Sequence, residues 1–172
     1  AEPDALQLMY TQKMMAFLLL LPNPRHIVIV GLGGGSLTKF CYQQLPRARI
    51  TTIEINQQII GFGELFQVPP PNKRTRILHA DAADYFAATR ERADVVLLDG
   101  CDRHGVVSAL CEPGFYRNLR KRLQPGGVLA VNLIGHAHNA DQLQALIAAE
   151  FASPVMTLDV SDGGNRIVFA IN

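Results

Sequence analysis

Residues 26–40, HIVIVGLGGGSLTKF, decide the fold of this chain. A short β-branched run, His26–Val30, stops at a glycine-rich turn, and a helix-compatible segment follows at once. Glycines let the backbone turn tightly and approach a ligand closely, and the helix behind the turn directs its free N–H groups at that ligand. The pattern predicts a nucleotide-binding turn at the end of a parallel strand, built from four glycines: Gly31, Gly33, Gly34 and Gly35.

The composition is that of an ordinary folded domain. The chain has 172 residues, of which 48% are hydrophobic and 18% are charged, so we expect residues 1–172 to form a single nucleoside-binding, Rossmann-like domain. The net charge of +1 gives no broad reason to expect nucleic acid or a membrane as a partner, and we interpret the cationic groups at Lys73–Arg76 and Arg117–Arg122 as solvated faces. Three cysteines without a CxxC pair favour a reducing cytoplasm over a disulfide framework or a zinc site.

Strand-like and helix-like stretches alternate along the chain. The strands are near-continuous apolar runs, as expected when both faces of a sheet are covered. This alternation predicts an α/β three-layer sandwich with a mostly parallel sheet. The expected strands are 26–30, 49–55, 75–80, 94–98, 127–133, 155–160 and 166–171, and the expected helices are 36–44, 57–66, 82–90, 113–123 and 140–151.

The N-terminal segment, residues 1–24, is expected to be helical. Apolar residues at helical spacing form one stripe, which predicts a helix over Leu6–Leu21 that ends before Pro22. The apolar run Met14–Leu21 is too short to span a bilayer, which needs about 20 residues. No small-residue cleavage pattern follows it, so a signal peptide is not expected.

The C-terminal end of the sheet is expected to differ from the rest. Asp162-Gly163-Gly164-Asn165 predicts a tight turn between the last two strands, so the final strand should run antiparallel to its neighbour. A mostly parallel seven-stranded sheet with such a hairpin resembles the class I S-adenosylmethionine-dependent methyltransferase fold.

Acidic residues lie at the ends of two predicted strands, at the edge where an open α/β sheet binds its ligands. Glu54 lies about 20 residues past the glycine turn, which suits a carboxylate that accepts both ribose hydroxyls; the alternative is an acid that caps the helix starting near Asn56. Asp81 can accept the adenine amino group while Ala82 supplies a backbone N–H. Capping of helix 82–90 is the alternative for Asp81, and both roles can hold together.

Asp99 and Asp102 leave the next strand and enter a glycine-bounded loop. Two carboxylates beside the glycine turn can bind a cation, orient a nucleophile or take a proton. The alternative is a turn in which Asp side chains bond their own backbone. His136 and His138 lie near the end of the following strand, but two histidines do not make a metal site, so no metal is expected.

The segment from Tyr10 to Leu133 resembles the spermidine synthase family of polyamine aminopropyltransferases. The resemblance rests on the order and spacing of short motifs: Tyr10 with Met14-Met15, the Gly-Gly-Gly turn, IleGluIle at 53–55, Asp81-Ala82, Asp99-x-x-Asp102-x-x-Gly105, Phe115-Tyr116 and LeuGlnProGlyGly at 123–127. It implies that the co-substrate is decarboxylated S-adenosylmethionine and that a small amine is the acceptor.

The resemblance also implies roles for the acidic residues. Glu54 holds the ribose and Asp81 faces the adenine. Asp99 lies beside the sulfonium, and Asp102 is the base that helps activate the amine. Attack on a carbon next to a sulfonium needs mainly alignment, so no metal is required.

Four features depart from the family pattern. Ser36, which with Tyr10 is expected on the substrate side, replaces the acid after the glycine turn; it can cap the following helix but carries no charge. Arg103 replaces a proline, and Gly100-Cys101 replaces a Ser/Thr pair. The family's N-terminal β-rich domain, which helps bind the amine and assemble subunits, is expected to be missing from these residues, and a homodimer is one expected assembly.

Two other functions fit the same residues. One is a methyltransferase that uses intact S-adenosylmethionine, because Ser36 removes a charge that would repel the donor's carboxylate. The other is a non-catalytic nucleoside-binding homologue, which would bind methylthioadenosine and transfer nothing.

Overall fold

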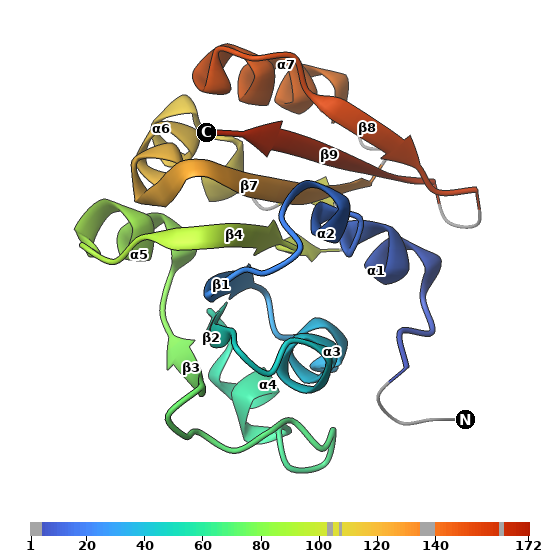
Figure 1. Cartoon of the computed structure of the whole chain (residues 1–172), viewed down its shortest axis with the longest axis vertical. Coiled ribbons are helices and arrows are strands. Elements are labelled where there is room, and N and C mark those ends of the chain that lie inside the picture. The colour runs from blue at the N-terminus through green and yellow to red at the C-terminus, as the bar shows by residue number, and fades with distance from the viewer. Residues whose placement is uncertain (1–4, 103–104, 107, 135–139, 162–163) are drawn as a thin grey trace.

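The computed structural model describes residues 5–102, 105–106, 108–134, 140–161 and 164–172, with the backbone alone between 101 and 109. Its main element is a seven-stranded sheet in the order β3-β2-β1-β4-β7-β9-β8 (Figure 1). The strands are β1 (His26–Val30), β2 (Arg49–Glu54), β3 (Thr75–His79), β4 (Ala93–Leu98), β7 (Leu123–Ile134), β8 (Met156–Asp159) and β9 (Asn165–Ile171). The helices are α1 (Met9–Met14), α2 (Phe17–Leu20), α3 (Ser36–Gln44), α4 (Gln57–Gly61), α5 (Ala82–Ala88), α6 (Pro113–Arg122) and α7 (Ala140–Phe151), with a 3₁₀ turn, η1 (Ser108–Cys111).

The direction of the strands determines where the site forms. Strands β3, β2, β1, β4 and β7 pair in parallel, whereas β9 runs antiparallel to both β7 and β8. The predicted fold class is therefore confirmed, including the antiparallel C-terminal hairpin. Because parallel strands end at the same edge of a sheet, the turns that follow β1 to β4 meet at that edge.

Helices cover both faces of the sheet (Figure 1). All residues of β1 are buried, but they alternate between two cores. Val28 and Val30 pack in a cluster with residues of α5, α6 and α7, whereas Ile27 and Ile29 pack in a cluster with residues of α1, α2 and α3. Burial of both faces explains why the strand is apolar throughout instead of alternating with polar residues.

The helix predicted over Leu6–Leu21 is wrong, because the segment forms two short helices, α1 and α2. Between them the backbone N–H groups bond to the carbonyl three residues earlier, as Ala16 does to Lys13 at 3.0 Å, which is the tighter 3₁₀ pattern. This turn leaves Met14 and Phe17 fully buried in the same core cluster. In the part of the chain that is described, no helix has the length and apolar character needed to cross a membrane.

Three further differences concern element length and number. The helix predicted over 57–66 is shorter, because α4 ends at Gly61 and none of its residues is buried; a short helix depends on packing of one face for its stability. The strand predicted over 127–133 is longer, since β7 covers 123–134. The hairpin β5 (Cys101–Asp102) and β6 (Gly105–Val106) was not predicted, and it forms a separate two-stranded sheet.

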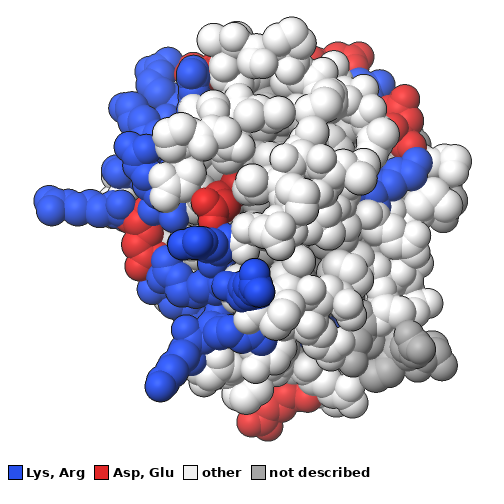
Figure 2. Space-filling model, in the orientation of Figure 1, with Lys and Arg blue, Asp and Glu red and all other residues white. Residues whose placement is uncertain are grey.

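Lysine and arginine side chains gather along one edge of the molecule, at the left of Figure 2. This is the edge where the parallel strands begin. Arg49 and Arg76, from β2 and β3, both pair with Glu91 there. A hollow at the same edge is lined by four cations: Arg92, Arg117, Arg120 and Lys121. The cations thus lie at the opposite ends of the strands from the acids discussed below.

Candidate active site

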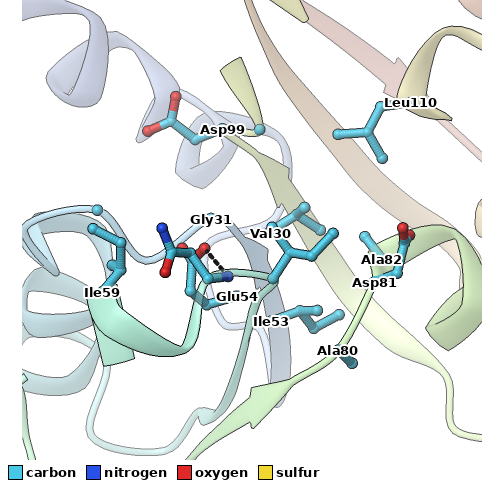
Figure 3. Close-up of a pocket in the computed structure, with 14 residues that line it drawn as sticks. Val30, Gly31, Ile53, Glu54, Ile59, Ala80, Asp81, Ala82, Asp99 and Leu110 are labelled. Atoms are coloured by element: carbon cyan, nitrogen blue, oxygen red, sulfur yellow. Dashed lines mark hydrogen bonds between the residues drawn. The ribbon is translucent and has the colours of Figure 1, made fainter. Parts of the chain in front are cut away.

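A pocket opens at the carboxyl-terminal ends of the parallel strands (Figure 3). Its volume of about 370 Å³ falls within the usual range for small-molecule sites, about 300–1,000 Å³. It brings together six of the residues expected from the sequence: Gly31, Gly33, Glu54, Asp81, Ala82 and Asp99. The sequence reasoning missed several apolar neighbours, among them Ile55, Ile59 and Leu110, because a single apolar residue in a loop or in a helix as short as α4 or η1 carries no periodic signal.

The glycine turn is shaped by a close approach between the ends of β1 and β4. Gly31 has a φ of +93°, and a Cβ at this position would lie 2.5 Å from the carbonyl oxygen of Asp99, so a larger residue requires the backbone to move. Gly33 has a φ of +48°. Apart from the neighbouring residues in the chain, no atom of the described residues comes within 4 Å of a Cβ added at Gly33 or Gly34. The space beside this turn is therefore open to a ligand.

The helix after the turn is capped by a glycine. Gly35 is the N-cap of α3 with a φ of +74°, and Ser36 is the first helical residue. The expectation that Ser36 caps this helix is wrong, since no side chain makes a cap hydrogen bond at this end. Ser36 is exposed and, with Gly34 and Gly35, does not line the pocket. Its contact with a substrate remains a prediction.

Glu54, at the end of β2, is buried with 8% of its surface exposed. Its Oε2 accepts a hydrogen bond from the backbone N–H of Leu32 at 2.8 Å, and its Oε1 accepts one from that of Asn56 at 2.9 Å; Figure 3 draws the second bond. The helix cap in this segment is Asn56, whose side chain accepts from Gln58, so the alternative that Glu54 is the cap is wrong. The Glu54 carboxylate instead joins the glycine turn to β2 and faces the pocket.

Asp81 combines the two roles that the sequence allowed. It is the N-cap of α5, where its Oδ1 accepts from the N–H of Ala83 at 2.7 Å, and it also lines the pocket together with Ala82. Among the residues the structure describes, only Oδ1 of this carboxylate has a partner. The cap fixes the side chain, and the second oxygen is left for a ligand.

Asp99, at the end of β4, is held from two sides. Its Oδ2 accepts from the Tyr10 hydroxyl at 3.2 Å, and its Oδ1 accepts from Asn132 Nδ2 at 2.8 Å. Burial raises the pKa of the Asp99 carboxyl above its ordinary value, and the hydrogen bonds from Asn132 and Tyr10 act in the opposite direction. A carboxyl group whose pKa is raised in a pocket is a candidate for proton exchange with a ligand.

Tyr10 therefore reaches the site through Asp99, although it does not line the pocket itself. Asn132 was missed by the sequence reasoning. Its only signal was a polar residue inside the apolar run of β7, where it is buried with 4% of its surface exposed.

The second acid of the loop, Asp102, is described only by its backbone. It lies in β5 and pairs with Gly105 of β6 in an antiparallel hairpin. The direction of its side chain lies outside the description, as do Arg103, His136 and His138, so the roles expected for these residues remain predictions. Across the described part of the chain, no group of three His, Cys, Asp or Glu residues is placed to hold a metal ion.

The fold defines the class of the protein: it is that of the S-adenosylmethionine-dependent methyltransferases, here with three acidic residues around a pocket at the carboxyl ends of the parallel strands. The family model of the spermine/spermidine synthase domain matches residues 7–144. The chain therefore belongs to the spermine/spermidine synthase family, which confirms the resemblance seen in its motifs.

Similar proteins include aminopropyltransferases and a methyltransferase. A polyamine aminopropyltransferase from Neisseria meningitidis is 33% identical over 170 residues, which cover 98% of this chain and 65% of that protein; the chain thus spans about 65% of the length of this relative. The structure of human methyltransferase-like protein 13 in complex with SAH has a TM-score of 0.84 at 25% identity, covering 95% of this chain and 82% of that one. A spermidine synthase in complex with the transition state analogue AdoDATO has a TM-score of 0.78 at 21% identity, covering 95% of this chain and 60% of that one. This similarity shows that the two proteins share a fold.

Proposed function

We propose that this chain is the catalytic part of an aminopropyltransferase, which moves an aminopropyl group from decarboxylated S-adenosylmethionine to a small amine. Membership of the spermine/spermidine synthase family supports this reaction. The observation that carries the proposal is the pocket itself, where the carboxylates of Glu54, Asp81 and Asp99 come from the ends of different strands and line one cavity. The donor and the acceptor of this reaction are both cations, which a pocket lined by carboxylates attracts.

Glu54 and Asp81 hold the nucleoside in this proposal. A carboxylate has about four lone-pair sites, and Glu54 uses two of them for backbone N–H groups, which leaves two for the ribose hydroxyls. The free oxygen of Asp81 accepts from the adenine amino group. Ala82, in the first turn of α5, offers its backbone N–H to the same ring, and the open space beside Gly33 accommodates the donor chain.

The transfer breaks one C–S bond and forms one C–N bond. The amine nitrogen attacks the carbon next to the sulfonium, the sulfur keeps the electron pair of the breaking bond and leaves as methylthioadenosine, and the amine releases one proton. Because an alkyl ammonium has a pKa of about 10, a group in the site must bind it and take this proton. We assign this task to the pair Asp99 and Asp102, with Asp102 as the base that helps activate the amine and Asp99 beside the sulfonium.

Product release from the full chain tests the proposal. The protein is incubated with decarboxylated S-adenosylmethionine and a panel of diamines, and methylthioadenosine is measured by chromatography. We expect amine-dependent release that falls by about 100-fold or more in Asp99→Asn and Asp102→Asn. Asp84→Asn is the matched control, because Asp84 is exposed on α5 and does not line the pocket. Absence of release with every diamine contradicts the proposal.

The same assay with intact S-adenosylmethionine separates the other candidate functions. Ser36 does not repel the extra carboxylate of the intact donor, so this donor is a necessary comparison. Turnover of the intact donor to S-adenosylhomocysteine would assign methyl transfer to the chain. Binding of methylthioadenosine without turnover of either donor would identify a non-catalytic homologue.

A further inference from the structure

Two asparagines connect Asp99 to the C-terminal hairpin. Asn132 on β7 donates from Nδ2 to Asp99 Oδ1 at 2.8 Å, and Asn165, the first residue of β9, donates from Nδ2 to Asn132 Oδ1 at 2.9 Å. The register explains the second contact: Asn165 pairs with Ile134, so it is the diagonal neighbour of Asn132 on the same face of the sheet. A line of three side chains thus runs from the hairpin to the pocket.

The order of donors along this line fixes which end of the Asn132 amide faces Asp99. A side-chain amide has one accepting end and one donating end. Because Asn165 donates to the oxygen of Asn132, the NH₂ group of Asn132 faces Asp99, and this group can only donate. A donor favours the ionised form of a carboxyl group, which accepts. Asn132 is buried, so protein groups, Asp99 and Asn165 among them, and not bulk water, orient its amide.

We propose that Asn132 and Asn165 form a positioning relay that holds the Asp99 carboxyl group ionised and oriented toward the pocket. The relay is a property of the ligand-free protein, and only its effect on catalysis rests on the function proposed above. Through this relay the antiparallel hairpin contributes to the site, because Asn165 on β9 orients Asn132.

Other groups act on Asp99 at the same time. The phenol of Tyr10 donates to its second oxygen from α1. The carboxylates of Glu54 and Asp81 share the pocket with it, and like charges disfavour ionisation. The relay therefore works with Tyr10 against burial and against the neighbouring negative charges.

Asn165→Asp reverses the relay. A carboxylate at this position accepts and does not donate, so the NH₂ group of Asn132 turns toward it and the Asn132 oxygen faces Asp99. We expect the pKa of Asp99 to rise by about one unit. This pKa is measured in the ligand-free protein by a ¹³C NMR titration of the labelled carboxyl group. The signal is assigned by its absence in Asp99→Asn. Asn165→Ala removes the donor without adding charge, and we expect a smaller rise in the same direction.

Further variants separate the relay from a simple charge effect. Asn172→Asp makes the same change just past the other end of β9, where Asn172 bonds to Arg120 and Leu123, and it should leave the pKa of Asp99 unchanged. Asn132→Ala should remove more than half of the shift caused by Asn165→Asp. Asn165→Gln restores an amide donor, and we expect it to behave more like the parent than like Asn165→Ala, which decides the matter if Asn132→Ala does not fold.

Two results overturn the relay: no shift in Asn165→Asp, or an undiminished shift when Asn132 is alanine. In the active enzyme, the acid limb of the pH profile for kcat should move upward with the pKa of Asp99, and at pH values above this limb KM for the nucleoside donor should match that of the parent. A shift in the NMR titration without any transferase activity would count against the proposed function alone. Full activity without the NMR shift would count against the relay alone.

Discussion

Replacing Glu54 with glutamine should lower both the stability of the ligand-free protein and its affinity for a nucleoside. Glu54 is buried, and each of its oxygens accepts one backbone N–H, from Leu32 and from Asn56. Glutamine keeps one accepting oxygen and puts an NH₂ group against the other N–H, so one hydrogen bond to a charged group is lost. Such a bond contributes about 1.5–3 kcal/mol. We therefore expect the free energy of unfolding to fall by about 2 kcal/mol, which lowers Tm by about 4–8 °C in a domain of this size.

The loss of affinity follows from the same chemistry. The ribose hydroxyl that faces the new amide loses a bond to a charged acceptor, again about 1.5–3 kcal/mol. Because 1.4 kcal/mol is tenfold in Kd, this predicts binding of methylthioadenosine that is about 10- to 100-fold weaker.

Calorimetry and thermal unfolding measure the two effects separately. Glu64→Gln makes the same substitution at an exposed glutamate outside the pocket, and it should change neither quantity. An affinity within twofold of the parent would refute the assignment of Glu54 to the nucleoside. An unchanged Tm would refute the structural role given to its two backbone hydrogen bonds.

Three further changes probe the rest of the site. Asp81→Asn keeps an N-cap but loses the charge, so it should weaken methylthioadenosine binding with little change in Tm. Asp81→Ala also removes the cap, so it should lower the free energy of unfolding in urea by about 1 kcal/mol. Equal stability of the two variants would contradict the capping role of Asp81. Gly31→Ala should cost about 2–3 kcal/mol, because its Cβ meets the Asp99 carbonyl at a positive φ, and Gly34→Ala, with open space around it, should not. Because the pKa of Asp99 is raised in the folded state, its contribution to stability is present at acid pH and is lost as pH rises from about 4 through the folded-state pKa. The free energy of unfolding of Asp99→Asn in urea should therefore increase relative to that of the parent as pH rises. A difference that does not depend on pH would contradict this.

The elements with a strong pattern could be predicted from the sequence. Strand β1 and helices α3 and α7 have the predicted bounds, because a strand buried on both faces is a continuous apolar run and a helix with one buried face has apolar residues at helical spacing. Helix α4 has no buried residue, and Phe62, Leu65 and Phe66 after it are exposed, so no buried apolar face extends the helix to residue 66. The break between α1 and α2 could not be predicted either, since the apolar stripe continues across it.

Candidate site residues next to a strand end could be predicted for a similar reason. Glu54, Asp81 and Asp99 each lie where a parallel strand stops, and one sheet edge brings these positions together. Asn132 and Asn165 could not be found in this way, because their contact depends on the register between β7 and β9. Register is set by pairing in three dimensions, and a lone asparagine in a strand or a turn does not reveal it.

A structure of the chain bound to methylthioadenosine would show whether a sulfur-bearing adenosine occupies the pocket with its reactive end at Asp99. We expect both ribose hydroxyls within hydrogen-bond distance of the Glu54 carboxylate, the adenine amino group at Asp81, and the sulfur on the side of the pocket that Asp99 lines. A nucleoside bound elsewhere on the chain, or one whose sugar turns away from Glu54, would contradict this expectation.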